Sequence, residues 1–315
     1  MDQISTIDIK SCPWCDSREE QKIVAKTYDY TYLTCSNEFT YVKCNACKCY
    51  FLKNRPSLET LNIIYPDNYS TYEYKKSLGL SYKLKNIYSI YKIIFTWYFS
   101  LKHLSNKNKS IIKIMEIGCG GGDYLSLLKK YISFLSGLEV QTTGVDFSCP
   151  KREGIDYSIS GDISNLKIKE NYYDLIICYQ LIEHVRNPKE VLKKMINSLS
   201  FSGILIIETP FLKSVDASLI KKRFWAGWHA PRHWAFINPN EIMKYSNALG
   251  CFSKLSWTPC PYMWIESIRN LCSNKLKKFF SISNPFLVIL FTIIDYLLIF
   301  IGFKTSNINI KIIKK

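Results

Sequence analysis

Histidine and arginine are both scarce in this chain. Only four of its 315 residues are histidine, so few imidazoles are available for acid–base chemistry or metal binding. The formal net charge is +16, but nearly all of the basic residues are lysine and only seven are arginine. Arginine is the side chain favoured for bidentate contacts with phosphates and bases. The composition therefore argues against a dedicated nucleic-acid surface, whereas a moderate attraction to anionic membranes or nucleotide-linked substrates fits the charge equally well.

The chain also lacks, at its N-terminus, the apolar run that a secretory signal needs. Residues 1–10 read MDQISTIDIK, which is a polar segment. We therefore expect the protein to stay in a reducing cytoplasm, either free or peripheral at the inner face of the membrane. In that compartment its 12 cysteines are expected to be thiols or metal ligands.

Long apolar segments are lacking too, with one exception at residues 286–303. About 20 apolar residues are needed to cross a bilayer, so this run is barely long enough. It contains Asp295, which would cost roughly 2.5–3.5 kcal/mol at the bilayer centre. Residues 307–313 then alternate as a strand does, and a strand that joins the preceding sheet must return to the side that the chain left. We expect a buried or interfacial helical insertion here rather than a single membrane span.

The cysteines of residues 1–56 show a metal-binding pattern. Four of them form two Cys-x-x-Cys pairs, namely Cys12 with Cys15 and Cys44 with Cys47. Each pair brings two thiolates together around a short turn, which suits a tetrahedral zinc ion in a zinc-ribbon-like module. Four sulfur ligands leave no open position, so such a site would be structural. Cys35 and Cys49 are alternative ligands, and free cysteines packed in a core are the alternative to zinc.

Residues 57–108 are expected to form a helical connector. Apolar residues recur there at three- and four-residue steps: Leu84, Ile87, Tyr91, Ile94, Tyr98 and Leu101. This spacing places them on one face of a helix, and we expect that face to pack on the domain that follows. His103, also in this connector, is expected to be solvated rather than catalytic.

From residue 109 onward, short apolar strands alternate with helical stretches. Strands are predicted at residues 111–117, 140–145, 157–160, 174–179, 203–209, 252–257 and 307–313. Helices are predicted at residues 123–134, 188–199 and 238–249. Near-continuous apolar strands separated by helices are typical of a parallel sheet that is covered on both faces. The sequence therefore predicts a Rossmann-like α/β domain at 109–315, with insertions near 211–235 and 261–304.

A glycine-rich turn follows the first of these strands, in residues 115–123, MEIGCGGGD. Glycines let the backbone approach a ligand closely and bring the next helix N-terminus to face it. Counted from Gly118, the third glycine of a dinucleotide fingerprint should fall at Asp123, and no Lys-Ser/Thr pair follows as in a phosphate-binding loop. Two acidic residues flank the turn. Glu116 suits a ligand with positive charge, and Asp146, at the end of the second strand, suits the two hydroxyls of a ribose.

In this order, these segments resemble the class I S-adenosylmethionine-dependent methyltransferases. The pattern Glu-x-Gly-x-Gly-x-Gly matches the first motif of that family, and residues 173–179, 181–185 and 203–210 match its fourth strand, the segment after it and its fifth strand. The resemblance covers residues 111–210 and implies a seven-stranded methyltransferase sheet with helices on both faces. It also implies that the following residues contact S-adenosylmethionine: Glu116, Gly118, Gly120, Gly122, Asp146, Asp162 and Tyr179.

A hydroxyl acceptor needs a general base to take its proton. His184, with Glu183 beside it, follows the fourth strand at the sheet edge where such folds bind ligands, and it is the leading candidate. A structural histidine that caps the turn is the alternative. Residues 224–234, FWAGWHAPRHW, resemble a Trp-His-x-Pro-Arg-His pattern of bacterial methyltransferases of this group. They are expected to form a lid over the acceptor, with His233 as a further catalytic candidate, and a purely architectural segment is the alternative.

One departure from related sequences concerns Gln180. Ubiquinone-pathway O-methyltransferases, which the chain resembles after the fourth strand, place there a Glu-x-x-Glu-His cluster that can hold a divalent cation. Gln180 replaces the first Glu of that cluster, which argues against magnesium. Residues 179–182 also lack the Asp/Asn-Pro-Pro-aromatic motif of amino-methylating enzymes, which favours an oxygen or carbon acceptor.

The expected acceptor is a small molecule, a sugar or glycan precursor. Paired cysteine knuckles ahead of such a domain are similar to bacterial enzymes that modify sugars in surface-polysaccharide or natural-product pathways. Two other functions stay open. Lys275, Lys277 and Lys278 lie beside the apolar run and suit peripheral membrane contact through residues 275–303, by an O-methyltransferase acting on a lipid or quinone. The other is a non-catalytic, zinc-dependent nucleic-acid-binding protein, against which the intact cofactor motif argues.

Overall fold

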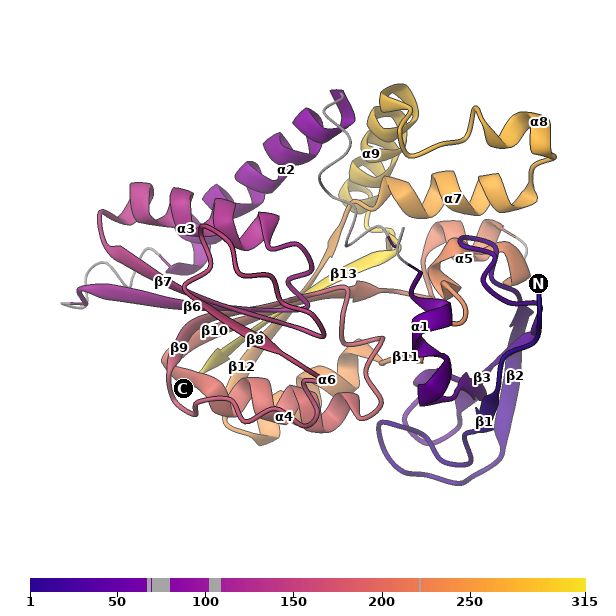
Figure 1. Cartoon of the computed structure of the whole chain (residues 1–315), viewed down its shortest axis with the longest axis horizontal. Coiled ribbons are helices and arrows are strands. Elements are labelled where there is room, and N and C mark those ends of the chain that lie inside the picture. Colours follow the sequence, from indigo (N-terminus) through magenta and orange to yellow (C-terminus); the bar gives the residue numbers. More distant parts are fainter. Residues whose placement is uncertain (67–68, 70–79, 102–108, 221) are drawn as a thin grey trace.

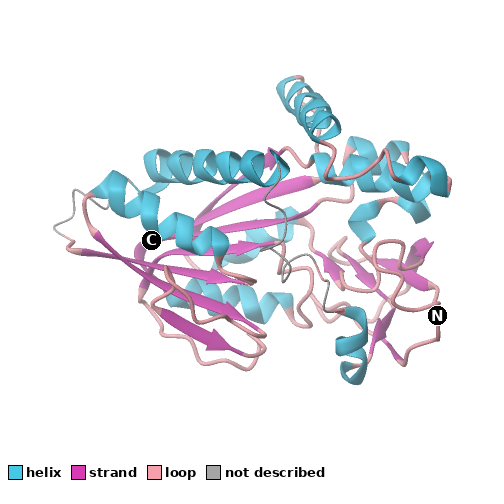
Figure 2. Cartoon of the chain, turned by 45° about the horizontal axis from the view of Figure 1, so that its top comes forward, coloured by secondary structure: helices cyan, strands magenta, loops and turns pink. Residues whose placement is uncertain are grey.

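The computed structural model describes residues 1–66, 69, 80–101, 109–220 and 222–315. Parts of the predicted connector at 57–108 therefore lie outside the described residues, and so does His103. Figure 1 shows a twisted central sheet with helices on both faces, and smaller sheets near the N-terminus beside it. Figure 2 shows the same layers after a turn of the molecule.

The central sheet has seven strands in the order β12-β13-β10-β9-β6-β7-β8. Their bounds are β6 Ile111–Ile117, β7 Glu139–Asp146, β8 Tyr157–Ser160, β9 Tyr173–Tyr179, β10 Leu199–Pro210, β12 Cys251–Thr258 and β13 Asn307–Lys314. Strands β6 to β10 run parallel, whereas β13 is antiparallel to both β10 and β12. The predicted α/β class with a methyltransferase-like sheet is confirmed, and the C-terminal strand indeed returns to it.

Helices α2 and α3 cover one face of this sheet, and α4 and α6 cover the other (Figure 1). Their bounds are α2 Leu80–Thr96, α3 Asp123–Ser136, α4 Pro188–Ser198 and α6 Pro239–Ala248. Helix α3 buries Leu125, Leu128 and Ile132, which recur at three- and four-residue steps on one face. Helices α4 and α6 each begin with a proline at the first helical position, where the missing backbone N–H costs nothing.

The predicted packing face of the connector helix is wrong. Ile87 is 62% exposed and Tyr91 55% exposed, and Ile94 and Tyr98 are also exposed. The helix continues into a π-helical turn at Trp97–Leu101, and the residues that it buries are Ile93, Trp97 and Leu101. These three recur every four residues, and only Leu101 belongs to the predicted set. The side chain of Leu84 is outside the described part of the helix, so the prediction fails at four of its six residues. Because both faces are apolar, periodicity alone could not identify the buried one.

The N-terminal segment forms two small sheets. One pairs β1 Thr6–Asp8 with β5 Asn54–Pro56, and the other has the order β11-β4-β3-β2, with β2 Gln21–Thr27, β3 Phe39–Cys44, β4 Tyr50–Leu52 and β11 Ala235–Phe236. Strand β11 belongs to the insertion after β10, and it adds to β4 through the pairs Ala235 with Phe51 and Phe236 with Tyr50. The insertion near 211–235 is thus part of the N-terminal sheet.

The C-terminal insertion is helical. It contains α7 Pro261–Leu271, α8 Asn274–Lys277 and α9 Pro285–Phe300. Asp295 of α9 is buried and accepts hydrogen bonds from the Cys260 amide (2.7 Å) and the Trp264 indole (2.8 Å). Only Leu287 and Asp295 of α9 are buried, so a buried insertion is wrong, whereas the interfacial form of the expectation stays a prediction. Across the described residues, no helix has both the length and the apolar character needed to span a membrane. Two short helices complete the chain, α1 Leu61–Ile64 and α5 Val215–Leu219.

Candidate functional site

The glycine-rich turn follows β6 and leads directly into α3. Gly118, Gly120 and Gly122 have φ angles of +79°, +50° and +75°, in the left-handed region that favours glycine. A Cβ atom on Gly122 would also lie 2.4 Å from the Cδ1 atom of Ile155. Side chains at these positions would therefore be strained, and glycine lets the backbone itself form the wall of a site at the carboxyl end of the sheet.

A cavity lies at this edge of the sheet, where β6, β7 and β8 end. Its walls include Gly118, Asp146 and Asp162, three of the residues predicted to bind cofactor. Phe147 and Leu181 line it as well, and neither was predicted from the sequence. The available signal in the sequence was that Phe147 directly follows β7 and that Leu181 follows the end of β9. A mixed acidic and apolar wall suits a ligand with both a polar sugar and an aromatic base.

The two aspartates of this wall are held by backbone amides. Asp146 Oδ2 accepts a hydrogen bond from the amide of Gly120 at 2.9 Å. Asp162 Oδ1 accepts one from the amide of Ser164 at 2.9 Å. Both carboxylates have further lone pairs that these bonds do not use. The amide of Gly120 in the glycine-rich turn therefore fixes the orientation of the Asp146 carboxylate.

Glu116 is buried directly beneath the turn. Its Oε2 atom has no hydrogen-bond partner among the described residues. Burial, together with the neighbouring Asp146 charge, raises the pKa of the Glu116 carboxyl to about 8, although the Lys92 ammonium opposes this shift. The group is thus protonated at neutral pH, and a nearby cationic ligand would favour its ionised form.

Tyr179 lies at the end of β9 but does not line the cavity. Its ring packs on that of Tyr124, with centroids 5.4 Å apart, and the Lys92 ammonium lies 3.9 Å from its ring centroid. Glu116, Gly120 and Gly122 are likewise not among the lining residues. The structure therefore brings Gly118, Asp146 and Asp162 together around the cavity and sets the other four predicted residues behind or beside that wall.

Three of the four histidines form a cluster at the other end of the cavity. The ring centroids of His184 and His233 are 4.6 Å apart, those of His229 and His233 5.0 Å, and those of His184 and His229 6.4 Å. His184 comes from the segment after β9, whereas the other two come from the insertion after β10. His184 also lines the cavity described above, together with Trp234. The cluster and the cavity therefore share one wall.

Glu183 is fully buried beside this cluster. Its Oε2 atom accepts a hydrogen bond from Thr209 Oγ1 at 2.9 Å, whereas Oε1 has no hydrogen-bond partner among the described residues and lies 3.9 Å from His233 Nε2. His233 Nδ1 lies 2.8 Å from the carbonyl oxygen of Gly227. A carbonyl only accepts, so Nδ1 carries the proton and Nε2 is free to accept one. Burial raises the pKa of the Glu183 carboxyl to about 8.

His184 is held by a tyrosine from outside the methyltransferase-like segment. The hydroxyl of Tyr65 lies 3.1 Å from His184 Nδ1. Burial lowers the pKa of His184 to about 4, so its imidazole is neutral at pH 7 and can accept a proton. The ligand atoms of Glu183, His184 and His233 lie within 4.8 Å of one another, close enough to surround a cation. Only one of the three is an oxygen ligand, which suits magnesium poorly.

A buried ion pair ties the N-terminal segment to this wall. Arg232 and Asp29 are both inaccessible to solvent, and their two bonds measure 3.1 Å and 3.0 Å. Arg232 Nε also donates to the carbonyl of Ile64 at 2.6 Å, and the Tyr41 hydroxyl donates to the carbonyl of His233 at 2.9 Å. The sequence did not predict Asp29 or Tyr41, because their partners Arg232 and His233 lie 203 and 192 positions away along the chain.

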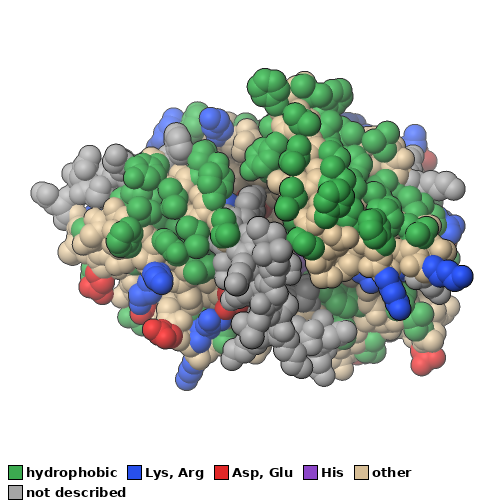
Figure 3. All heavy atoms as spheres, turned by 90° about the horizontal axis from the view of Figure 1, so that it is seen from above, with side chains coloured by type: hydrophobic (Ala, Val, Ile, Leu, Met, Phe, Trp, Pro, Cys, Tyr) green, Lys and Arg blue, Asp and Glu red, His purple; other side chains and the backbone are tan. Residues whose placement is uncertain are grey.

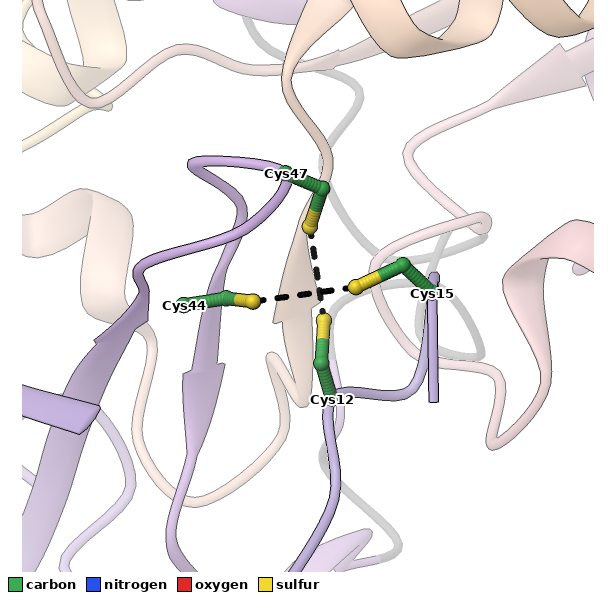
Figure 4. Close-up of side chains that lie close together, drawn as sticks. All are labelled: Cys12, Cys15, Cys44 and Cys47. Carbon is green, nitrogen blue, oxygen red and sulfur yellow. Dashed lines mark hydrogen bonds between the residues drawn. The ribbon is translucent and has the colours of Figure 1, made fainter. Parts of the chain in front are cut away.

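The four predicted metal ligands converge in the N-terminal segment. Figure 4 shows the side chains of Cys12, Cys15, Cys44 and Cys47 pointing toward a common centre. The sulfurs of Cys12 and Cys47 are 3.5 Å apart, those of Cys15 and Cys44 are 3.7 Å apart, and all four lie within 4.8 Å of one another. Zinc–sulfur bonds of about 2.3 Å in a tetrahedron give sulfur–sulfur edges of about 3.8 Å. The donor set and its spacing therefore fit zinc.

Cys35 and Cys49 lie outside this group of four. Cys35 is buried among the apolar side chains of the N-terminal sheet. The Cys49 sulfur accepts a hydrogen bond from the amide of Asn238 at 3.2 Å. Neither therefore takes the place of the four paired cysteines.

Comparison with known proteins finds a methyltransferase domain in just under half of the chain. Residues 97–251, which are 155 of the 315, match the family model described as a methyltransferase domain. A ubiquinone biosynthesis O-methyltransferase from Rickettsia canadensis is 25% identical over 143 residues, covering 43% of this chain and 60% of that protein. A tRNA U34 carboxymethyltransferase from Helicobacter pylori is 29% identical over 148 residues, covering 43% of this chain and 56% of that protein.

Among solved structures, a putative sarcosine dimethylglycine methyltransferase from Galdieria sulphuraria matches with a TM-score of 0.48 at 11% identity. This match covers 74% of this chain and 88% of that one. The chain spans about 60% of the length of the first curated relative described above. Residues 97–251 thus match a methyltransferase domain, and the central sheet has the α/β arrangement predicted for a class I S-adenosylmethionine-dependent methyltransferase.

Proposed function

We propose that this protein is an active methyltransferase that transfers a methyl group from S-adenosylmethionine to an oxygen or carbon of a small molecule, a sugar or glycan precursor. The observation that carries the proposal is the shared wall at His184. This residue borders the cavity of Gly118, Asp146 and Asp162 on one side and the histidine cluster on the other. A bound cofactor and an acceptor would therefore meet beside a neutral imidazole.

The predicted cofactor residues have distinct roles in this proposal. Asp146 would accept hydrogen bonds from the ribose hydroxyls, and Asp162 would lie beside the adenine amino group. Glu116, with its unpartnered buried oxygen, would face the positively charged end of the ligand. Gly118 lets the backbone approach. Tyr179 stays a predicted contact, and its position behind the cavity wall suits a supporting role.

Proton removal from a hydroxyl acceptor would fall to the histidine cluster. When bound, S-adenosylmethionine supplies an electrophilic methyl group on a sulfonium. His184 is neutral at pH 7 and would accept the acceptor proton as the methyl bond forms, with Tyr65 orienting the ring. Glu183 and His233 form a second buried pair that would hold or pass that proton. The insertion that carries His233 would form a fixed cover over the acceptor, because its tryptophans and Arg232 are buried.

We also propose that Cys12, Cys15, Cys44 and Cys47 bind a structural zinc ion. The ion would hold together two turns of the N-terminal segment, residues 1–56, one before β2 and one at the end of β3. Because that segment supplies Asp29 and Tyr41 to the acceptor wall, zinc would support the site without touching substrate.

The experiment that tests the cofactor site is calorimetric titration of S-adenosylmethionine and S-adenosylhomocysteine into the purified, zinc-loaded protein. We expect micromolar binding that Asp146→Ala weakens by roughly 10–100-fold, as the loss of hydrogen bonds to a charged group predicts. Glu170→Ala, which removes an exposed carboxylate away from the cavity, should bind like the wild type. No binding to the folded protein would overturn the enzyme proposal and favour the nucleic-acid-binding alternative, which filter binding of RNA and DNA at several salt concentrations would then test.

A second candidate acceptor is a lipid or quinone, and the exposed apolar helices favour it. The leading sugar proposal predicts methylation of nucleotide-linked or free sugars in solution. The second predicts turnover only of acceptors presented in vesicles or detergent. An acceptor screen in both formats separates the two.

A further inference from the structure

Two helices far apart in the sequence present apolar side chains on the same side of the molecule. Helix α9 exposes seven of its large residues: Phe286, Ile289, Leu290, Ile293, Tyr296, Leu297 and Phe300. The most exposed of them is Phe300, at 88%. Helix α2 exposes Ile87, Tyr91, Ile94 and Phe95. Figure 3 looks down on this side and shows hydrophobic side chains covering much of it, on either side of the residues drawn in grey.

The two helices are neighbours in space. Figures 1 and 2 both place α9 beside one end of α2. The phenol of Tyr91 is near enough to Tyr296 to add to the effect of burial in raising the pKa of Tyr296. Monomeric soluble proteins seldom expose contiguous apolar patches above a few hundred Å². The exposed faces of α2 and α9 together are therefore candidates for an interaction surface.

The charges around these helices indicate which partner fits. The only charged residue in α9 is Asp295, and its carboxylate turns inward to the Cys260 amide and the Trp264 indole. The outward face of α9 is thus uncharged. At its N-terminal side, Lys275 and Lys278 are exposed beside the exposed Leu276 and Phe279. Apolar and aromatic side chains bordered by lysine are what an anionic membrane surface binds.

The length and packing of α9 indicate how it would lie. Its 16 residues measure about 24 Å, which is short of the roughly 30 Å of bilayer hydrocarbon. Its inward face is packed on α7, so it is not free to cross a membrane. An in-plane position at the lipid surface suits both facts.

We propose that α2, α8 and α9 form a peripheral docking surface for an anionic lipid bilayer. Helix α7 packs against α9 and also against the 3₁₀ helix Ala226–Trp228, which directly precedes His229. The docking surface therefore lies one helix away from the wall of the histidine cluster. Where the proposed methyl transfer holds, this placement favours the second candidate acceptor, a lipid or quinone in the bilayer, over a sugar in solution.

Flotation of the full-length, zinc-loaded protein with vesicles tests this surface. We expect the protein to float with vesicles of phosphatidylcholine containing about one third phosphatidylglycerol, and at least several-fold less with phosphatidylcholine alone. The double variant Leu297→Glu/Phe300→Glu should lose flotation by at least about tenfold. Lys275→Ala/Lys278→Ala should weaken binding to anionic vesicles by about fivefold for each lysine near the surface, and should reduce its salt dependence.

A matched control is Phe201→Glu. It places a glutamate on an exposed aromatic position near the N-terminal end of β10, outside the proposed surface. It should float like the wild type. Equal flotation of wild type and the α9 variant, or none of the wild type, would overturn the proposal. So would light scattering that shows a dimer which the two glutamates dissociate, in a protein that does not float, because the face would then join two copies of the chain.

Calorimetry with S-adenosylmethionine on the same samples separates this inference from the proposed activity. A protein that floats but binds no cofactor would overturn the methyltransferase proposal and leave the docking surface standing. A protein that binds cofactor normally but does not float would overturn only the docking surface.

Discussion

A single carboxyl group, that of Glu116, couples the protonation of the protein to its proposed cofactor. Burial and the neighbouring Asp146 raise the pKa of this carboxyl to about 8, so it carries a proton at neutral pH. A ligand with positive charge would lower that pKa. Binding would therefore release the proton, and the free energy of binding would depend on pH in the window below 8.

We expect the Kd for S-adenosylmethionine to fall as pH rises from 6 to 8, by up to about tenfold for each pH unit, and to level off above 8. Calorimetry at pH 7 in buffers of different ionisation enthalpy should show about one proton released per ligand bound. Glu116→Gln should abolish both effects, because the amide does not titrate. A pH-independent Kd in the wild type would mean that this carboxyl does not face the charged end of the ligand.

For individual residues, the sequence predicted those that belong to motifs but not the side chains that hold them in place. Glu116, the three glycines and Asp146 were recognisable because they are close together or at fixed strand ends. Tyr65 and Asp29 were not, because their contacts with His184 and Arg232 join segments that no local pattern relates. Phe147 was missed for another reason: an apolar residue after a strand is too common to indicate a site.

Among the elements, the insertion after β10 depends on the N-terminal segment for its shape. Arg232 is inaccessible to solvent and is neutralised by Asp29. Burial alone would raise the pKa of the Asp29 carboxyl, but the Arg232 guanidinium holds it below its usual value. This carboxylate is therefore ionised at neutral pH, and the pair positions the backbone next to His233.

Removing one member of this pair should destabilise the protein strongly. We expect Asp29→Ala to lower the free energy of unfolding by about 3–5 kcal/mol, because it leaves the buried Arg232 charge unpaired. Urea denaturation at constant zinc concentration measures the change. The double variant Asp29→Ala/Arg232→Met should recover part of the loss, since it removes both charges. A loss below about 1 kcal/mol in Asp29→Ala would show that water or another group replaces the carboxylate.

The elements also show where periodicity is sufficient and where it is not. The inner strands β6, β9 and β10 were predictable because each is an apolar run, and β13 was predictable because its isoleucines alternate. Helix α2 was predictable as a helix, but its buried face was not. Ile93, Trp97 and Leu101 pack inward, whereas the equally regular stripe that includes Ile87 and Tyr91 stays exposed. Apolar spacing identifies a helix face that avoids water, and a membrane satisfies that need as well as a core does.

For the whole molecule, the proposed zinc site would control the stability of both parts of the chain. Its four cysteines lie in the N-terminal segment, and that segment contacts the insertion through β11, Arg232 and His233. Loss of the metal should therefore be felt at the acceptor wall as well as in the N-terminal sheets.

We expect the wild-type protein to contain about one zinc per chain, measured by elemental analysis, and Cys15→Ser to contain almost none. The variant should also unfold at a lower temperature, because metal binding to the folded state contributes free energy of folding. Cys272→Ser is the control, since that half-buried cysteine lies outside the cluster. Zinc retained in Cys15→Ser would contradict the assignment of this ligand.

The pairing of β11 with β4 has a consequence for biosynthesis. Residues 21–52 leave the ribosome long before Ala235 and Phe236 are made, so their sheet must wait for its last strand until about three quarters of the chain exists. During that interval β4 is an unpaired edge, which is a template for aggregation. A nascent chain that binds zinc early would keep the ends of this unfinished sheet together. The four-stranded sheet is thus begun early in translation and completed late. Chains that end before residue 235 would lack β11 and would leave the edge of β4 unpaired.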